Sequence, residues 1–337
     1  MSSVSSSPAS ASPADVTRIH RAAVLGLGLI GGSMLQVLRH SGIEVVGYDT
    51  DPDAVDAASA AGYPVAPSDA AAVHGADLVV LAMPLPQVRD ALRSVAAHLP
   101  PGTLLTDVGT LKVPVAAAVR EFAPHATFVG GHPLAGVEDT GWAAADPLLF
   151  RDCPWALVLD EDATDAQLVA WLRLAGLVCD LGAKPVPTTA AAQDSAVARV
   201  IGLPHVLAEA LALTGLAGGP LGLTLAAGSY RSGSRVARTR PELVTSWCDG
   251  NRALTEALDD AIAHLTEARA ALDDDRSILP LAVAGHDARV NWEHRRFEPV
   301  EPAPTASALL ELGRSGGWLT ALLRDDDGLR LLGMRPV

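Results

Sequence analysis

The chain has 337 residues, of which 49% are hydrophobic, and its formal net charge at pH 7 is −14. This length can bury more than one hydrophobic core. The acidic balance argues against a nucleic-acid partner, because most of the surface would repel a phosphate backbone. The three cysteines are far apart and show no metal-ligand spacing, so we expect a reducing, cytoplasmic compartment and no metal site.

The N-terminal segment, residues 1–18, is rich in serine and has neither a basic segment nor an apolar core. It is therefore unlike a secretory signal or an arginine-rich transit peptide. We expect a disordered tail.

Residues 22–49 show the pattern of a dinucleotide-binding unit. An apolar strand runs into a glycine-rich turn of the form G-x-G-x-x-G, and a helical pattern follows. The spaced glycines allow a tight turn and the close approach of a diphosphate, which the helix N-terminus attracts. Asp49 ends the next predicted strand, where a carboxylate accepts ribose hydroxyls and repels a 2′-phosphate. The sequence therefore predicts NAD rather than NADP, bound by Gly26, Gly28, Leu29, Ile30, Gly31 and Asp49.

Predicted strands and helices alternate as far as residue 184. The strands cover 76–83, 103–108, 127–130, 155–159 and 178–181, and the helices cover 53–61, 87–99, 113–122 and 165–175. This order predicts an α/β Rossmann domain with a doubly wound, mostly parallel sheet over residues 19–184. Ligands bind at the carboxyl ends of such strands, and Asp107 and His132 both follow strand ends.

Helical patterns replace the strands beyond residue 184. Residues 188–214, 221–227 and 241–272 are rich in alanine and leucine, which predicts an all-helical domain over residues 185–276. The stretch from Leu203 to Tyr230 is apolar, but Gly218-Gly219-Pro220 divides it into halves too short for a bilayer. We expect a buried helix pair or a subunit interface instead. Prolines and mixed charges over 277–305 predict an extended arm within a C-terminal extension, residues 277–337.

A histidine lies on a second glycine-rich turn, at residues 130–138. Little side-chain bulk surrounds His132 there, so a ligand can approach it closely, and the ordinary imidazole pKa near 6.5 suits proton transfer. A histidine that only satisfies its own turn is the simpler interpretation. The nearby nucleotide fingerprint favours a base.

Two further segments place charged side chains in unexpected settings. Lys112 is one of only two lysines among 25 basic side chains, so we interpret it as a placed ammonium, although Asp107 and Thr110 could simply cap the helix that follows. Arg231 and Arg235 stand in an apolar segment, where an arginine usually binds a carboxylate. The alternative is an arginine tied to a helix end or to a glutamate.

Together these motifs resemble the prephenate dehydrogenase family of tyrosine biosynthesis, which includes arogenate and cyclohexadienyl dehydrogenases. The resemblance spans residues 22–252 and rests on five segments, Gly26–Ser33, Asp107–Lys112, Gly131–Gly136, Leu203–His205 and Ser234–Ala237. It implies a Rossmann domain joined to a helical dimerisation domain. It also implies NAD or NADP as the hydride acceptor, and oxidative decarboxylation of a cyclohexadiene acid by a homodimer.

The resemblance also implies roles for single residues. His132 would be the base that takes the ring-hydroxyl proton, and Thr110, at the family's serine position, would orient it. Arg235 would hold a substrate carboxylate, and His205 would line the pocket. The remaining expected site residues are Lys112 and Glu138 on the substrate side and Asp107 on the cofactor side.

Three positions depart from the family pattern. Gly202 stands where a pocket histidine is usual, Gln193 stands where the family often has histidine before aspartate, and Ser232 lies in a segment that often reads R-D-x-T-R. These changes remove polar groups from the substrate side, so the sequence supports the cofactor better than the substrate.

Prephenate is the expected substrate, and arogenate is the alternative. Arogenate carries an ammonium, for which Glu138 or Asp139 is a candidate partner unless these residues cap the next helix. Two other classes remain open, a β-hydroxyacid or imine dehydrogenase and a non-catalytic NAD sensor. The hydroxyacid type resembles this chain less, because it requires a lysine in its helical domain and no lysine follows Lys184.

Overall fold

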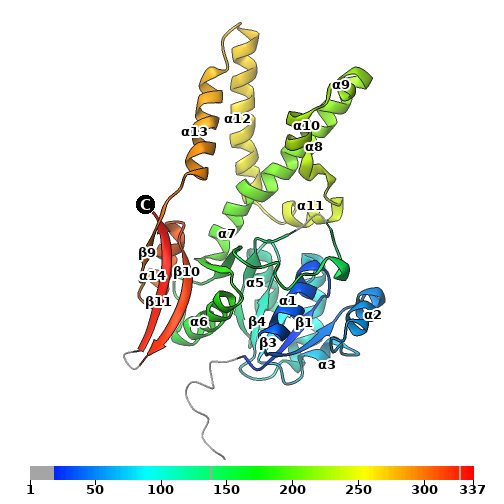
Figure 1. The fold of residues 1–337 in the computed structure, drawn as a ribbon, viewed down its shortest axis with the longest axis vertical. Coiled ribbons are helices and arrows are strands. Elements are labelled where there is room, and N and C mark those ends of the chain that lie inside the picture. Colours follow the sequence, from blue (N-terminus) through cyan, green and yellow to red (C-terminus); the bar gives the residue numbers. More distant parts are fainter. Residues whose placement is uncertain (1–18, 137–138, 326–327) are drawn as a thin grey trace, which may run out of the picture.

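The computed structural model describes residues 19–136, 139–325 and 328–337 (Figure 1). The expected tail at residues 1–18 lies outside the described residues, and so does Glu138. Figure 1 shows the sheet domain at the base, helices projecting away from it, and the C-terminal strands at its side.

The first part of the chain forms the predicted doubly wound domain. Its five strands are all parallel and have the order β2-β1-β3-β4-β5. Alternate residues of β1 enter two separate buried apolar clusters, so helices cover both faces of the sheet. The strands are β1 (Arg21–Leu25), β2 (Glu44–Tyr48), β3 (Leu78–Leu81), β4 (Leu104–Asp107) and β5 (Thr127–Val129), and the helices are α1 (Leu29–His40), α2 (Pro52–Ala60), α3 (Asp69–Val73), α4 (Leu85–Val95) and α5 (Val113–Phe122).

A second sheet of three strands follows, in the order β6-β7-β8. The strands β6 (Gly131–Pro133) and β7 (Pro154–Val158) are antiparallel, and β8 (Lys184–Thr188) runs parallel to β7. The strand predicted over 178–181 is wrong, because these residues complete and terminate α6 (Asp165–Asp180). Gly182, with φ of +79°, ends this helix and turns the chain into β8. A short apolar run fits a buried helix as well as a strand, so its pattern could not decide.

One helix of 28 residues, Ala190–Ala217, leads out of the sheet domain. It comprises α7 (Ala190–Val197), a π-helical turn at Ala198–Gly202 and α8 (Leu203–Ala217). By length and composition alone it could cross a membrane. The half that begins at Leu203 is 15 residues long, as expected, but the helix continues back to Ala190, which the sequence did not predict. Its N-terminal part is nevertheless tied into the sheet domain by Gln193 and Asp194, which are buried.

The rest of the helical part differs from prediction in two places. The pattern over 241–272 is two helices, α11 (Pro241–Cys248) and α12 (Ala253–Asp273), separated by a turn at residues 249–252. The extended arm predicted from residue 277 is largely a helix, α13 (Leu279–Glu293), whose Pro280 lies in the first turn, where proline is tolerated. The remaining short helices are α9 (Gly219–Leu225) and α10 (Gly228–Gly233).

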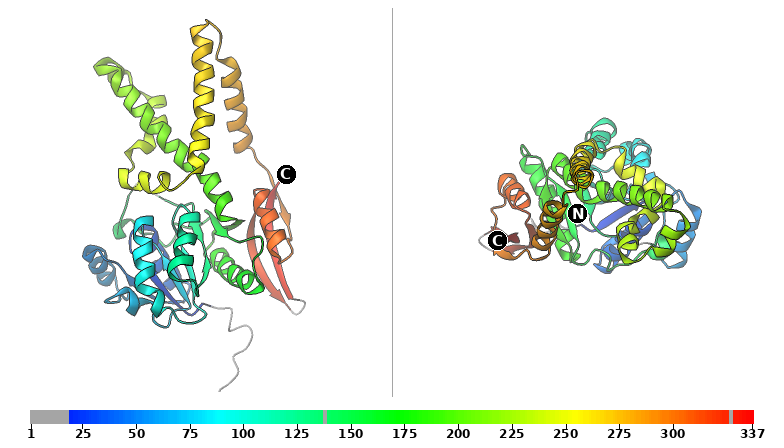
Figure 2. Two further views of the ribbon diagram at one scale, coloured as in Figure 1. Left: turned by 180° about the vertical axis from the view of Figure 1, so that it is seen from behind. Right: turned by 90° about the horizontal axis from the view of Figure 1, so that it is seen from above.

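The C-terminal extension folds back onto the sheet domain (Figures 1 and 2). It comprises β9 (Phe297–Val300), α14 (Ala306–Arg314), β10 (Trp318–Asp325) and β11 (Gly328–Pro336), with an antiparallel sheet of order β10-β11-β9. Leu309, Leu312 and Leu331 are buried in the same cluster as Trp171 of α6. The extension is therefore part of one of the two main cores.

The contact between α14 and β8 gives a test of this packing. A Cβ atom at Gly313 of α14 would lie 1.7 Å from the Pro187 carbonyl oxygen. We expect Gly313→Ala to lower the free energy of unfolding by about 1–3 kcal/mol, measured by urea denaturation. The control is Gly285→Ala in α13, where nothing lies within 4 Å and a gain of up to about 1 kcal/mol is expected. Equal stability of the two variants would contradict the packing.

Candidate active site

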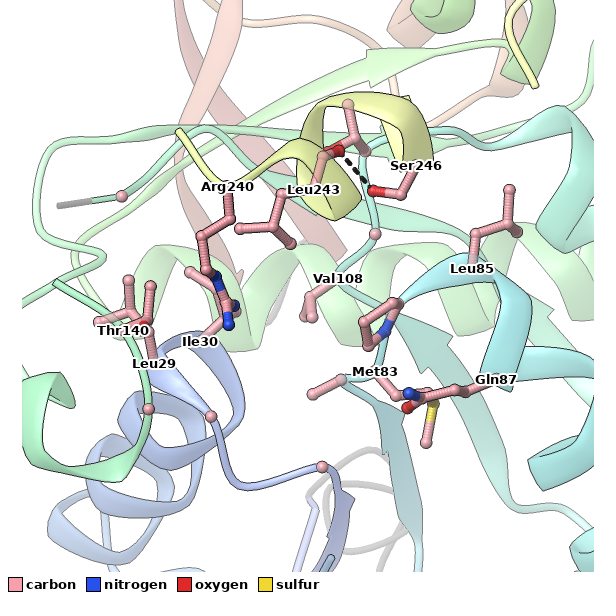
Figure 3. A pocket seen from close by; sticks show the side chains of 18 of the residues that line it. Leu29, Ile30, Met83, Leu85, Gln87, Val108, Thr140, Arg240, Leu243 and Ser246 are labelled. Carbon is pink, nitrogen blue, oxygen red and sulfur yellow. Dashed lines mark hydrogen bonds between the residues drawn. The ribbon is translucent and has the colours of Figure 1, made fainter. Parts of the chain in front are cut away.

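A cleft of about 1610 Å³ lies between the carboxyl ends of the parallel strands and the helices that follow residue 190. Figure 3 shows Leu29 and Ile30, at the start of α1, on one wall and Leu243 and Ser246 of α11 on the other. The side chain of Arg240, just before α11, extends toward Leu29 and Ile30 (Figure 3). The volume suits a dinucleotide together with a small substrate, because drug-sized ligand pockets measure roughly 300–1,000 Å³.

The glycine turn after β1 has the form that a diphosphate site needs. Gly26 has a φ of +98°, and a Cβ atom there would lie 2.3 Å from the Ala82 carbonyl oxygen. Nothing lies within 4 Å of the Cβ position at Gly28, which lines the cleft and precedes α1 without a side-chain cap. The first N–H groups of α1 are therefore open toward the cleft and can bind an anion. Of the expected cofactor residues, Gly26, Gly28, Leu29, Ile30 and Asp49 line the cleft, whereas Gly31 packs behind it against the Gly26 carbonyl.

Asp49 follows β2 and faces the cleft beside this turn. Its two carboxylate oxygens accept hydrogen bonds from the backbone N–H groups of Leu27, at 2.5 Å, and Asp51, at 2.9 Å. These bonds fix the carboxylate at the carboxyl edge of the sheet and leave further lone pairs for a ligand.

His132 lies on β6 with only 6% of its surface exposed. Its Nδ1 atom is 2.8 Å from Nε2 of Gln193. Burial, and secondarily the Lys112 ammonium, lower the pKa of His132 to about 3. The imidazole is therefore neutral at physiological pH, which a proton acceptor requires.

Lys112 lies beneath the cleft rather than in it. Its ammonium is 1% exposed and bonds to the Asp107 carboxylate and, at 2.5 Å, to the Gly131 carbonyl oxygen. The carboxylate also accepts from the N–H groups of Gly109 and Gly131. Neither Lys112 nor Asp107 lines the cleft, so the structure argues against the expected substrate contact of Lys112 and cofactor contact of Asp107.

Burial affects the two partners of this pair in opposite directions. It raises the pKa of Asp107, against the effect of the Lys112 ammonium, and lowers the pKa of Lys112, against the effect of the Asp107 carboxylate. Each group therefore depends on the other to remain charged.

The cap of α5 comes from a residue that the sequence did not single out for this purpose. Asp194 of α7 accepts hydrogen bonds from the N–H groups of Lys112, at 2.7 Å, and Val113, at 3.0 Å. Neither Asp107 nor Thr110 caps this helix, because its N-terminus has no local side-chain cap. The neighbouring Gln193 donates to the Thr110 carbonyl at 2.9 Å. The sequence marks Gln193 only as a departure from the family pattern, and the partners of both residues lie 81 to 83 residues away.

The substrate side of the cleft brings together Thr110, His132, His205 and Arg235. His205 of α8 is buried, and its ring centroid lies 4.9 Å from that of Trp247. Burial lowers the pKa of His205, so this side chain is a neutral wall of the cleft. Asp139 also lines the cleft, while Glu138 lies outside the described residues. Two cleft residues, Arg240 and Trp247, were not predicted from the sequence. The one signal in the sequence is an arginine-rich run that ends at Arg240, just before Pro241.

Two of the departures from the family pattern do not face the cleft. Gly202 packs against α12, where a Cβ atom would lie 3.2 Å from Leu254, and Ser232 is exposed on α10. Their expected effect on the substrate side is therefore not supported by this structure. Among the described residues no group of three or more His, Cys, Asp or Glu side chains could hold a metal ion.

Comparison with known proteins finds two family models in succession. Residues 35–186 match the nucleotide-binding domain of prephenate dehydrogenase, and residues 189–278 match its dimerization domain. A cyclohexadienyl dehydrogenase of Zymomonas mobilis is 32% identical over 266 residues, covering 74% of this chain and 87% of the relative. A prephenate dehydrogenase of Lactococcus lactis is 30% identical and covers 72% and 69%.

Solved structures agree with these relatives. A prephenate dehydrogenase-like protein of Corynebacterium glutamicum is 37% identical, with a TM-score of 0.76, and the match covers 81% of this chain and 89% of that one. The arogenate dehydrogenase of Synechocystis is 28% identical, with a TM-score of 0.69, and the match covers 81% and 99%. The prephenate dehydrogenase of Aquifex aeolicus, solved with hydroxyphenyl propionate and NAD+, has the same fold at 22% identity, with a TM-score of 0.73 and coverage of 81% and 98%.

The buried ion pair can be tested with the two lysines of the chain. Lys112→Met should lower the free energy of unfolding by about 3–5 kcal/mol, because it leaves the Asp107 carboxylate buried without its cation. Lys184→Met is the control, since Lys184 is 36% exposed and lies 3.6 Å from Asp152; it should cost less than about 1 kcal/mol. Similar costs in urea denaturation would show that the buried pair does not support the fold.

The lowered pKa of His132 predicts a pH dependence of stability. The unfolded imidazole has a pKa near 6.5, whereas the native one has a pKa of about 3. As the pH falls below about 6.5, the unfolded chain binds a proton that the native protein does not, so stability falls by up to about 1.4 kcal/mol per pH unit. His132→Asn should lose this part of the acid sensitivity between about pH 7 and 5. Parallel curves for the two proteins would refute it.

Proposed function

Because the chain belongs to the prephenate dehydrogenase family, we propose that it catalyses the NAD-dependent oxidative decarboxylation of prephenate to 4-hydroxyphenylpyruvate. One observation carries this proposal. Four candidate substrate residues, namely Thr110, His132, His205 and Arg235, line the same cleft as the nucleotide fingerprint. A protein that only sensed NAD would have no use for them.

The reaction needs a hydride acceptor and a base. The hydride leaves the ring carbon that bears the hydroxyl, and NAD, when bound, supplies the acceptor. The electron pair of the bond to the ring carboxylate moves into the ring as carbon dioxide departs, which restores aromaticity. His132 would take the hydroxyl proton as the hydride leaves and return it to the phenol oxygen, so no proton is lost overall.

The cofactor assignment rests on the two features of the cleft floor. The open N-terminus of α1 at Gly28 fits the diphosphate, and the Asp49 carboxylate would accept the ribose hydroxyls. The same carboxylate would repel a 2′-phosphate, so NAD is preferred over NADP.

The substrate assignment is prephenate, with arogenate as the second candidate. Arg235 can hold the side-chain carboxylate of either acid in a bidentate pair, so it does not discriminate between them. An ammonium needs an anionic partner, and Asp139 on the cleft wall is the described residue that favours arogenate. A prephenate dehydrogenase and an arogenate dehydrogenase are both among the similar proteins, which supports keeping both candidates.

The functional form in this proposal is a cytoplasmic homodimer without a membrane or nucleic-acid partner. The region that matches the dimerization domain exposes large apolar side chains that water disfavours, among them Leu213, Leu216, Leu221, Leu225, Ile262 and Leu265.

All three cysteines are free thiols. Burial raises the pKa of Cys153 to about 11 and that of Cys179 to about 12, so these thiols are unreactive.

A direct assay tests the proposed reaction. We expect reduction of NAD with prephenate, followed by absorbance, and a higher kcat/KM for NAD than for NADP because of Asp49. Asp49→Ser should narrow the difference between the two cofactors. A clear preference for arogenate would overturn the choice of substrate, and equal efficiency with both cofactors would overturn the role of Asp49.

A second assay tests the base. His132→Asn should bind NAD as the wild type does but lower kcat by roughly 10²–10⁴-fold. Binding is measured by calorimetry and kcat under conditions in which chemistry limits turnover. A variant that kept more than about a tenth of the wild-type kcat would remove His132 from the mechanism.

A further inference from the structure

Gln193 is a buried polar residue to which the proposed reaction gives no task. It lies on α7 with 3% of its surface exposed. Its Nε2 atom lies 2.9 Å from the Thr110 carbonyl oxygen and 2.8 Å from Nδ1 of His132. Its Oε1 atom is buried and has no hydrogen-bond partner in the part of the chain that the structure describes.

The Thr110 carbonyl sets the orientation of the Gln193 amide. A carbonyl oxygen can only accept, so the amide atom that faces it must be the nitrogen. Turning the amide over would place Oε1 against the Thr110 oxygen, where two acceptors repel. This orientation leaves Oε1 without a hydrogen-bond partner among the described residues, while Nε2 makes two contacts.

The second amide hydrogen then determines the state of His132. An amide nitrogen donates and does not accept, so Nδ1 of His132 must be the acceptor and cannot carry a hydrogen. A neutral imidazole has one ring hydrogen, which must therefore reside on Nε2. No hydrogen bond from Nε2 to a described residue is found, this atom is not enclosed, and His132 lines the cleft. The N–H group is thus directed at the substrate side.

We propose that Gln193 is a positioning residue that holds the resting His132 in its Nε2–H tautomer, so that the imidazole must change tautomer before Nε2 can accept the ring-hydroxyl proton. Action as a base requires a lone pair on Nε2, with the ring hydrogen on Nδ1. Gln193 opposes this arrangement, because its nitrogen cannot accept from Nδ1–H. The consequence for catalysis rests on the proposed function, whereas the tautomer itself does not.

The balance of the proton transfer follows from this assignment. The competent form arises when Nε2 gives its hydrogen to water in the cleft and Nδ1 takes one from water after the Gln193 amide turns away, so the proton count of the ring is unchanged. The hydroxyl proton then moves from the ring oxygen to Nε2 and later returns to the phenol oxygen. The charged groups that bond beneath the cleft are the Lys112 ammonium with its partner Asp107 and the Asp194 carboxylate bound to the N-terminus of α5. Arg235 and Asp139 line the cleft itself. None of them bonds to either ring nitrogen among the described contacts, so Gln193 is the residue that selects the tautomer.

The tautomer can be measured without substrate. The full-length protein, labelled with ¹⁵N in its histidines, shows which ring nitrogen bears hydrogen, and the His132 signals are those missing from His132→Asn. We expect the hydrogen on Nε2 in the wild type at neutral pH. A hydrogen on Nδ1 would overturn the proposal whatever the substrate proves to be.

Gln193→Glu should favour the other tautomer of His132, because the new side chain has the same shape but presents an acceptor oxygen. An oxygen in the place of Nε2 accepts from Nδ1–H, and if protonated it still donates to Thr110. We expect the hydrogen on Nδ1 in this variant and a mixture of tautomers in Gln193→Met, which neither donates nor accepts. An unchanged Nε2–H signal in both variants would overturn the role of Gln193.

The link to catalysis is read from kcat. Gln193→Glu should raise kcat several-fold at an unchanged KM for NAD, because the base no longer has to change its tautomer. The matched control is Gln167→Glu, the same substitution at an exposed residue in the first turn of α6, and its kcat should equal that of the wild type. A switched tautomer together with a fall in kcat would refute the link to catalysis.

Discussion

The buried pair of Lys112 and Asp107 is the interaction on which the rest of the site depends. The ammonium holds both the Asp107 carboxylate, at the end of β4, and the Gly131 carbonyl, at the start of β6. A charge in the protein interior is tolerated only with such partners. Lys112 therefore fixes the strand that carries His132 without reaching the cleft. Its charge also helps to keep the imidazole neutral, so the same group both places and tunes the proposed base.

Helix α7 makes the second connection, between the sheet domain and the helices beyond it. Asp194 caps α5 through two backbone N–H groups, and its own carbonyl accepts from Asn251 just before α12. The adjacent Gln193 reaches Thr110 and His132. Two successive residues of one helix thus hold the turn after β4, the candidate base and the start of α12. A shift of α7 would disturb all three of these contacts. This explains why the long helix that begins with α7 is polar and buried at its start, although its later part, α8, is apolar.

The parts that the sequence predicted well are those with a local cause. The glycine turn and the alternation of strands follow from backbone sterics and short-range periodicity, so the Rossmann domain and the cleft residues of the Gly26–Gly31 turn were predictable. The position of the Lys112 side chain was not predictable. A lone lysine on a turn gives the same sequence pattern whether it faces a ligand or a buried carboxylate 5 residues away. Gln193 and Asp194 act across 61 to 83 residues, and no local pattern encodes such contacts. The prediction for residues 277–293 was wrong for a different reason. A proline is favoured in the first turn of a helix although it breaks a helix interior, and Pro280 lies in the first turn of α13.

The two walls of the cleft differ in what holds them. The cofactor wall stands on a parallel sheet with cores on both faces, where Gly26 and Gly31 leave no space for a side chain. The substrate wall consists of short segments, the turn at Arg235–Arg238 and helix α11, joined to α8 by the contact of His205 with Trp247. Helices α8 and α9 leave apolar residues such as Leu216 and Leu221 in water. Burying them against a second copy in the proposed homodimer would remove this cost and restrain the wall. In the proposed homodimer, substrate recognition would thus depend on assembly, whereas the nucleotide turn is complete within one chain.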